Sequence, residues 1–256
     1  MIPAVEFREV VVARTHGKRI LGGVSLELDE GSTTVILGRS GSGKTTLLRT
    51  VNRLVQPVSG EVNIRGANVQ DVDVIALRRS IGYVVQETGL FPHFTVERNV
   101  GAVLEAMGRP AAERQERSNE LLASVELDPA LYAHRYPHQL SGGQRQRVGL
   151  ARALAADPPI LLMDEPFGAL DPLTRSEMQE MLINLLRRLR KTILLVTHDV
   201  DEALSLASRI VLLSEGLVEG VFTPDNFLAS QEPEVVAYLR PYRRRTEGTR
   251  REKVHE

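Results

Sequence analysis

The residues best suited to chemistry form a glycine-rich stretch from Gly38 to Thr45, in the order Gly, four residues, Gly-Lys-Thr. This spacing is typical of loops that wrap phosphate groups. Glycines such as Gly41 and Gly43 let the backbone N–H groups turn inward toward phosphate oxygens. Lys44 supplies a positive charge for the β- and γ-phosphates, and the Thr45 hydroxyl suits Mg²⁺. The stretch predicts binding of a nucleoside triphosphate.

The flanking residues supply the context that such a loop needs. The run 33–37 is short, β-branched and apolar, as a buried parallel strand should be. The run 45–54 has apolar residues at helical spacing, so a helix N-terminus adds its partial positive charge to the loop. The nucleotide-contacting residues predicted here are Gly38, Arg39, Ser40, Gly41, Ser42, Gly43, Lys44, Thr45 and Thr46.

Two adjacent carboxylates, Asp164 and Glu165, follow the apolar run 160–163. Open α/β sheets place ligand chemistry at the carboxyl ends of their strands. Asp164 is suited to hold Mg²⁺, directly or through water. Glu165 is suited to orient and deprotonate an attacking water. The pair predicts hydrolysis of the bound nucleotide.

A third stretch, Leu140-Ser141-Gly142-Gly143-Gln144, precedes a predicted helix over 145–156. Its hydroxyl and backbone N–H groups would form a second anion site at a helix N-terminus. The simpler structural interpretation is a helix N-cap. Because this cradle lies far from the first in the chain, the sequence suggests that two subunits share one nucleotide.

The elements that must position these residues alternate between strands and helices. Strands are expected within 5–28, at 61–64 and at 81–85, and helices over about 95–155. A strand at 160–163, a helix over 173–190, a strand at 192–197, a helix over 199–208 and a strand at 209–213 follow. This order predicts an α/β core with an N-terminal antiparallel β-subdomain and an inserted α-helical subdomain. We expect the core over 1–92 and 157–230 and the insert over 93–156.

The composition narrows the function further. The chain has 256 residues and a net charge of −1, which gives no general reason to expect a nucleic-acid partner. It has no cysteine, so disulfides, iron–sulfur clusters and thiolate zinc sites are excluded. The N-terminal residues lack the pattern of a signal peptide, and no apolar run approaches the ~20 residues of a membrane span. Any membrane role is therefore expected to act through a partner.

Six features in this order resemble the ATPase subunits of ATP-binding cassette (ABC) transporters over about residues 5–225. They are 38–45, Gln86, 140–144, 160–165, Ala169-Leu170-Asp171 and His198. The resemblance implies a P-loop ATPase that binds ATP and Mg²⁺ and hydrolyses ATP. It also implies a head-to-tail homodimer, in which Ser141 and Gly143 of one subunit face the γ-phosphate held by Lys44 of the other.

The resemblance also assigns roles to single residues. Gln86 corresponds to the loop glutamine that touches Mg²⁺ or the attacking water, and His198 to the switch histidine on the γ-phosphate. Asp171 lies in the dimer-contact loop, and His16 stands near the adenine-stacking position, where the family usually has an aromatic residue. The implied catalytic residues are Glu165, His198, Gln86 and Lys44. The implied metal ligands are Thr45, Gln86 and Asp164, and the implied nucleotide contacts add His16, Ser141, Gly142, Gly143, Gln144 and Asp171.

Three stretches are similar to importers of quaternary-amine osmoprotectants such as glycine betaine and choline. They are 81–95, 167–175 and 197–203. This resemblance implies a membrane permease and an extracytoplasmic solute-binding protein as partners, no nucleic acid, and a place on the cytoplasmic face of the membrane. The apolar loop 89–92 is expected either to receive a helix of the permease or to anchor the helical insert. A polar amino-acid importer and a soluble ABC ATPase that remodels a macromolecular complex stay open, as does the direction of transport.

The C-terminal segment 231–256 is basic. Its last 17 residues hold seven Lys or Arg and three Glu. The sequence predicts a partly disordered, solvated tail here, with contact to anionic lipid headgroups as the alternative.

Overall fold

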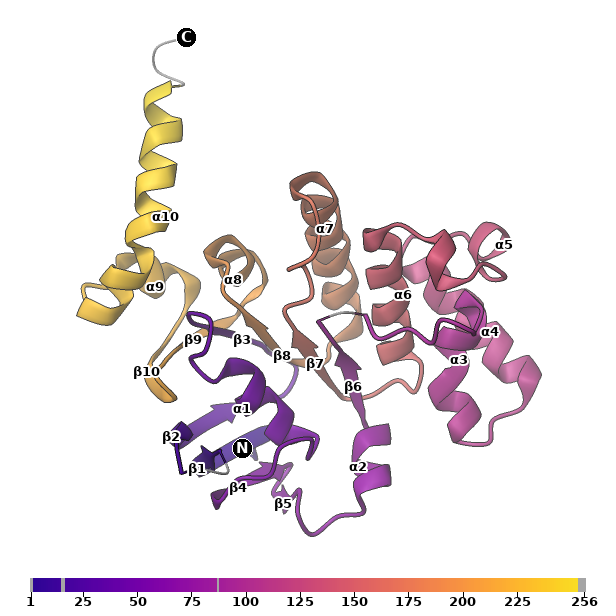
Figure 1. Ribbon diagram of the computed structural model, residues 1–256, viewed down its shortest axis with the longest axis horizontal. Helices are drawn as coiled ribbons and strands as arrows, with labels where there is room; N and C mark the ends of the chain where they lie inside the picture. The colour runs from indigo at the N-terminus through magenta and orange to yellow at the C-terminus, as the bar shows by residue number, and fades with distance from the viewer. Residues whose placement is uncertain (1, 15–16, 87, 253–256) are drawn as a thin grey trace.

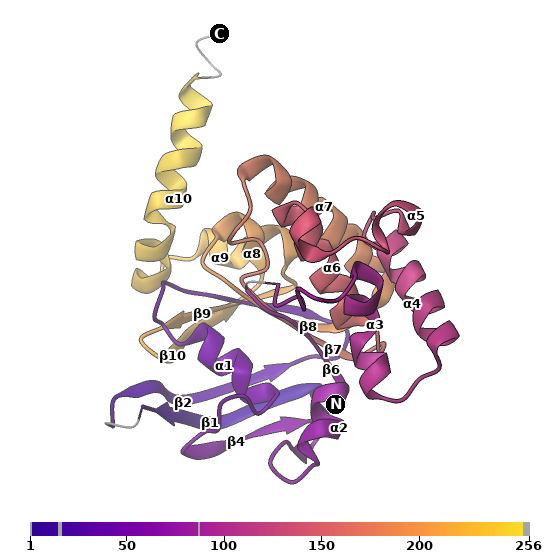
Figure 2. The ribbon, with the colours of Figure 1, turned by 45° about the vertical axis from the view of Figure 1, so that its right-hand side comes forward.

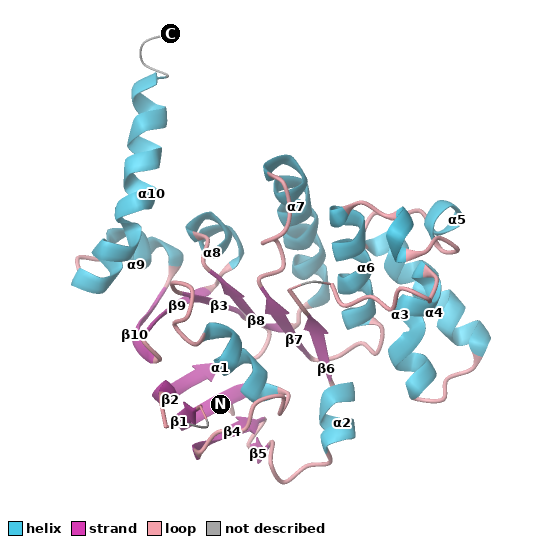
Figure 3. Ribbon diagram, in the orientation of Figure 1, coloured by secondary structure: helices cyan, strands magenta, loops and turns pink. Residues whose placement is uncertain are grey.

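The computed structural model describes residues 2–14, 17–86 and 88–252. Two sheets form its centre (Figure 1, Figure 3). The larger has six strands in the order β10-β9-β3-β8-β7-β6, and the smaller has four in the order β2-β1-β4-β5. The strands of the larger sheet are β3 (Thr33–Leu37), β6 (Ile81–Val84), β7 (Ile160–Asp164), β8 (Thr192–Thr197), β9 (Arg209–Ser214) and β10 (Leu217–Phe222). Those of the smaller sheet are β1 (Val5–Ala13), β2 (Arg19–Leu28), β4 (Ser59–Ile64) and β5 (Ala67–Asn68).

The larger sheet separates two apolar cores. Side chains alternate along each of its central strands because successive residues of a strand point to opposite faces. Val35 and Leu37 of β3 pack in one core with most of the helices. Ile36 packs in the other, together with helix α1 (Lys44–Val51) and the four-stranded sheet. Figure 2 shows α1 between the two sheets.

The strands β6 and β7 are joined by a helical insert. It consists of α3 (Val96–Ala106), α4 (Ala111–Ser124), α5 (Pro129–Tyr132), a 3₁₀ turn (Pro137–Gln139) and α6 (Gly142–Leu154). Its buried apolar residues belong to the same core as the helices α7 (Pro172–Leu189) and α8 (Val200–Leu206). A short helix α2 (Val74–Arg79), not expected from the sequence, precedes β6.

The C-terminal segment differs from the sequence expectation. Residues Pro233–Glu252 form helix α10 rather than a disordered tail, following α9 (Pro224–Ala229). Val235 and Leu239 are fully buried in the main core, which anchors the start of α10, while its far end projects away from the body in both views (Figures 1 and 2). The sequence expectation rested on the basic composition of this segment and overlooked apolar residues at helical spacing, namely Val235, Tyr238, Leu239 and Tyr242.

No helix in the described part of the chain combines the length and apolar character required to cross a bilayer.

Candidate functional site

The glycine-rich loop joins β3 to α1. Gly41 and Gly43 have φ values of +83° and +104°, which glycine adopts without the penalty of a side chain. The loop closes around Lys44, whose side-chain Nζ donates hydrogen bonds to Gly38 O at 2.8 Å and to Arg39 O at 3.0 Å. Lys44 is only 5% exposed, and this burial lowers the pKa of its amine.

Two further features of the loop fit an anionic ligand. The Ser42 hydroxyl is buried and has no hydrogen-bond partner among the described residues. A Cβ at Gly38 would lie 2.3 Å from Leu213 O and 2.7 Å from Ser42 Oγ, so only glycine fits at the start of the loop. A buried polar atom without a partner is costly, and a phosphate oxygen would accept the missing hydrogen bond.

Asp164 lies at the carboxyl end of β7 and is fully buried. It faces α1 because it shares a strand face with Ile160 and Leu162, which belong to the core around α1. Its carboxylate accepts hydrogen bonds from Thr45 Oγ1 at 2.7 Å, from Arg49 Nη2 at 3.2 Å and from Tyr83 Oη at 3.3 Å. The hydroxyl and the carboxylate together offer the oxygen ligands that Mg²⁺ prefers.

Arg49 and Tyr83 were not singled out from the sequence. Neither belongs to a motif, and they come from α1 and β6, so only the packing of these two elements brings them to Asp164. The helical spacing of Arg49 four residues after Thr45 was the one usable signal, since it puts both side chains on one face of α1.

Glu165 joins the predicted residues Gln86 and His198. Its backbone has φ of +45°, an unusual conformation for a residue with a side chain, and its N–H donates to Val196 O at 3.0 Å. Its Oε2 accepts from Gln86 Nε2 at 3.3 Å and lies 3.5 Å from His198 Nδ1. The side chains of Gln86, after β6, and His198, after β8, therefore meet at the carboxylate of Glu165, after β7.

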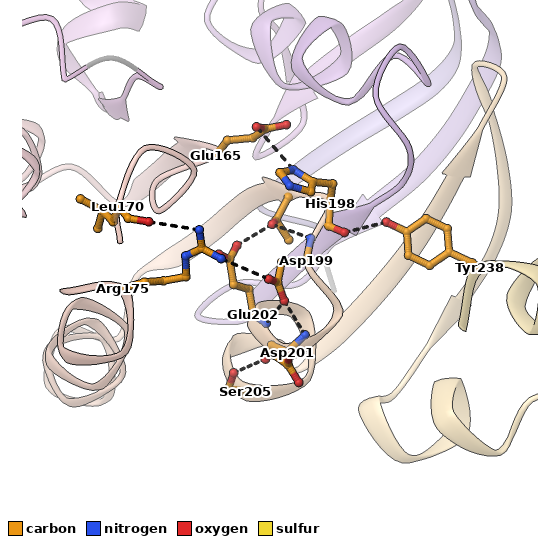
Figure 4. Close-up of polar contacts among 10 residues, drawn as sticks. Glu165, Leu170, Arg175, His198, Asp199, Asp201, Glu202, Ser205 and Tyr238 are labelled. Atoms are coloured by element: carbon orange, nitrogen blue, oxygen red, sulfur yellow. Dashed lines mark hydrogen bonds and ion pairs between the residues drawn. The ribbon is translucent and has the colours of Figure 1, made fainter. Parts of the chain in front are cut away.

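The loop after β8 is held by a second group of contacts, drawn in Figure 4. Arg175 of α7 donates to Leu170 O at 3.2 Å and lies 3.7 Å from Asp199 Oδ2. On the other side, Tyr238 Oη donates to the carbonyl of His198 at 2.9 Å.

Glu202 lies beneath this loop. Its carboxylate accepts a hydrogen bond from Thr197 Oγ1, and the side chain is only 3% exposed. Burial raises the pKa of Glu202 to about 6. The loop after β8 therefore rests on a buried acid that ionises less readily than usual.

The stretch 140–144 lies elsewhere, at the N-terminus of α6 in the helical insert. Ser141 is the N-cap: its Oγ accepts from Gln144 N at 3.2 Å, and Gln144 Oε1 accepts from Ser141 N at 2.9 Å. The N-cap interpretation of the sequence is therefore correct. Gly142 and Gly143 are the first two residues of the helix, and no described contact joins them to the phosphate loop of the same chain.

The two remaining predicted residues lie in different situations. Asp171 is the N-cap of α7, where its side chain accepts from Thr174 N at 3.1 Å, and the hydrogen bonds from Thr174 lower the pKa of its carboxyl. His16 falls outside the described residues, so its adenine-stacking role stays a prediction. Within one chain, the structure thus brings together Lys44, Thr45, Asp164, Glu165, Gln86 and His198.

These features define the class of protein. The family model described as "ABC transporter" matches residues 21–168, and the chain belongs to this family. The predicted α/β fold of an ABC ATPase is confirmed by solved structures. The dimeric bacterial ABC transporter cassette MJ0796 superposes with a TM-score of 0.78 at 37% identity, covering 86% of this chain and 98% of that one. A cassette from Clostridium perfringens, part of the cbiONQ transporter complex, gives a TM-score of 0.81 at 28% identity, covering 93% and 95%.

Among curated relatives, the chain is similar to ATP-binding proteins of osmoprotectant transport. It is 48% identical to the choline transport ATP-binding protein OpuBA of Bacillus subtilis, over 88% of this chain and 59% of that protein. It is 47% identical to the osmoprotectant import ATP-binding protein OsmV of Salmonella typhimurium, over 90% of this chain and 60% of that protein. The chain thus spans about three-fifths of the length of these relatives.

Proposed function

We propose that this chain is the ATP-hydrolysing subunit of an ABC importer for a quaternary-amine osmoprotectant of the glycine betaine or choline type. The observation that carries the proposal is the meeting of Gln86 and His198 at Glu165, beside a phosphate loop whose Thr45 contacts Asp164. The family membership and the names of the relatives support the transport role.

Each group of residues in the site has a separate role in phosphoryl transfer. The loop 38–46 and Lys44 bind the phosphates, and Glu165 accepts a proton from the attacking water. Gln86 orients that water, and His198 donates a hydrogen bond to the γ-phosphate. Thr45, Asp164 and Gln86 would hold Mg²⁺, which supplies positive charge against the phosphate oxygens.

The stretch at the start of α6 points to a second subunit. Ser141 and Gly143 present a helix N-terminus that makes no described contact with the phosphate loop of their own chain, and such a terminus attracts phosphate. We therefore propose a head-to-tail homodimer in which these residues, with Gln144 and Asp171, complete the nucleotide site of the partner.

The loop 88–92 is the proposed contact with the membrane permease. Phe91 is 44% exposed and lines a surface hollow of about 330 Å³ together with Arg79, Val103 and Arg152. Arg152 holds this loop by donating to Thr88 O at 2.6 Å and to Gly89 O at 2.7 Å. An exposed aromatic residue over a hollow, five residues after Gln86, suits a helix of a partner protein. Through the permease, the chain would sit at the cytoplasmic face of the membrane, with a solute-binding protein outside.

The test is affinity purification of the Glu165→Gln variant with ATP and Mg²⁺ from gently solubilised cells of the native organism, followed by mass spectrometry. We expect one multi-span permease and a solute-binding protein, and we expect Phe91→Asp to lose both while still binding ATP. Recovery of only ribosomal, DNA-repair or other soluble assemblies with either variant would favour the remodelling ATPase and overturn the proposal.

The solute is tested on the assembled complex. ATP turnover of the complex in proteoliposomes should rise when the solute-binding protein carries choline or glycine betaine. Stimulation by polar amino acids alone would replace the substrate class and leave the ATPase role intact.

A further inference from the structure

One contact ties the C-terminal helix to the candidate site. The hydroxyl of Tyr238, on α10, donates a hydrogen bond of 2.9 Å to the backbone carbonyl of His198. The ring is firmly placed, because Val235 and Leu239 on the same helix are fully buried in the main core. Tyr238 is therefore part of the packed body of the protein rather than of the projecting end of α10.

The strand register explains why this hydroxyl reaches the site. β3 and β8 are parallel neighbours with Leu37 opposite Thr197, so the next residues, Gly38 and His198, leave the sheet side by side. Burial raises the pKa of Tyr238 to about 12, and the nearby backbone of Gly38 opposes that rise. The hydroxyl thus lies between the first residue of the phosphate loop and the histidine that contacts Glu165.

Tyr238 also lines two hollows at this edge, as Arg39 and Ser40 do. One, of about 630 Å³, is lined by Ser40, Glu165 and His198 as well as Tyr238. The other, of about 400 Å³, is lined by Gly41, Ser42 and Tyr238. Tyr238 therefore lies next to Glu165 and His198 on one hand and next to the loop residues Gly41 and Ser42 on the other.

We propose that Tyr238 is a positioning residue for ATP hydrolysis: its hydroxyl fixes the backbone of His198 so that the imidazole meets Glu165. The inference rests on the proposed function and extends the site to α10. Arg175 of α7 forms an ion pair of 3.7 Å with the next residue, Asp199, from the opposite side. The loop after β8 is therefore held in place by contacts from both α7 and α10. Loss of the Tyr238 hydrogen bond should let the imidazole of His198 move away from Glu165, while the phosphate loop keeps its shape.

The test is Tyr238→Phe, which keeps the ring and removes the hydroxyl. We expect kcat for ATP to fall about 5–10-fold while KM stays within about twofold, because a misplaced group near the reacting atoms slows the chemical step more than binding. The matched control is Arg243→Ala, which removes another tether of α10, the hydrogen bond of 2.9 Å to Leu228 O. It should leave kcat unchanged, and an equal loss in both variants would mean that Tyr238 only anchors the helix.

A double variant separates a role through His198 from a general one. In a His198→Ala background, Tyr238→Phe should cause no further loss, because the group that it positions is gone. A further loss of the same size would overturn the inference. Hydrogen–deuterium exchange of the amides of 198–201 should be faster in Tyr238→Phe than in wild type, and unchanged exchange with unchanged kcat would also overturn it. If the wild-type chain shows no ATP turnover, the proposed function fails, while the exchange experiment still decides whether Tyr238 holds the loop.

Discussion

The hydroxyl of Thr45 donates a hydrogen bond of 2.7 Å to Asp164 Oδ1, although the two residues stand 119 positions apart in the chain. The order of strands makes this possible: β3, which leads to Thr45, and β7, which ends at Asp164, both flank β8. Alternation along β7 turns Asp164 toward α1 instead of the helical face. Sheet topology thus pairs Thr45 and Asp164, two of the three proposed metal ligands.

Thr45→Ala is expected to remove the benefit of Mg²⁺. ATP affinity without metal should change little, because Lys44 and the loop backbone remain, whereas the tightening by Mg²⁺ should fall about tenfold or more. Thr45→Ser keeps the hydroxyl and serves as the control. Calorimetric titration with ATP, with and without Mg²⁺, measures the affinity without metal and its increase by Mg²⁺. An undiminished increase in Thr45→Ala would show that Thr45 is not a metal ligand.

Glu165→Gln is expected to retain ATP binding and to lose at least about 100-fold in turnover, the usual contribution of a general base. With ATP and Mg²⁺, the variant should elute from a sizing column as a dimer. Glu177→Gln removes an exposed charge from α7 and is the control. Turnover like wild type in Glu165→Gln would show that another group activates the water.

The sequence predicted the core of this fold well because its central elements carry unambiguous patterns. The buried strands β7 and β8 are almost entirely apolar and the glycine loop carries a motif, so the strands' approximate bounds and the α/β class follow from them. Thr45, Asp164, Glu165, Gln86 and His198 were predicted by motif and resemblance, and the structure brings these five together.

What was missed depends on contacts between distant elements. Arg49 and Tyr83 belong to no motif, and their link to Asp164 exists only once α1 and β6 are packed. The helix α10 was mistaken for a disordered tail because its six arginines outweighed a short apolar stripe. Tyr238 was missed for the same reason.

Gly143 and Gly142 form a matched pair for testing the packing of α6 on α7. A Cβ at Gly143 would lie 2.4 Å from Thr174 Cγ2, whereas one at Gly142 would lie 3.8 Å from Leu170 Cδ2. Gly143→Ala should therefore lower the free energy of unfolding by about 1–3 kcal/mol through overpacking, and Gly142→Ala should change it by less than about 0.5 kcal/mol.

Urea unfolding measures both free energies. Adding Thr174→Ser to Gly143→Ala removes the clashing methyl group and should restore most of the loss. Equal stability of the two single variants would contradict the close contact between Gly143 and Thr174.

Glu202 should make stability depend on pH. Its pKa is about 6 in the folded protein against an ordinary 4.5, so between these values the folded state keeps a proton that the unfolded chain has lost. The free energy of unfolding contributed by this group is therefore highest below pH 4.5 and falls as the pH rises through 6, by about 2 kcal/mol in total.

Glu202→Gln should remove that fall, because an amide can still accept the hydrogen bond from Thr197 without ionising. The variant should gain stability relative to wild type at pH 7.5 but not at pH 4.5, as measured by urea unfolding at both values. A constant difference between the two proteins across this range would show that Glu202 does not ionise abnormally.

The position of β3 between β8 and β9 has a consequence for synthesis. This apolar strand leaves the ribosome long before either neighbour, since its partners begin at Thr192 and Arg209. At ~5–20 residues per second, both of its edges stay unpaired for on the order of ten seconds, and exposed strand edges invite aggregation. The nascent chain therefore needs protection until β8 and β9 are made, and a chain cut before β8 would possess the phosphate loop without either strand that flanks β3.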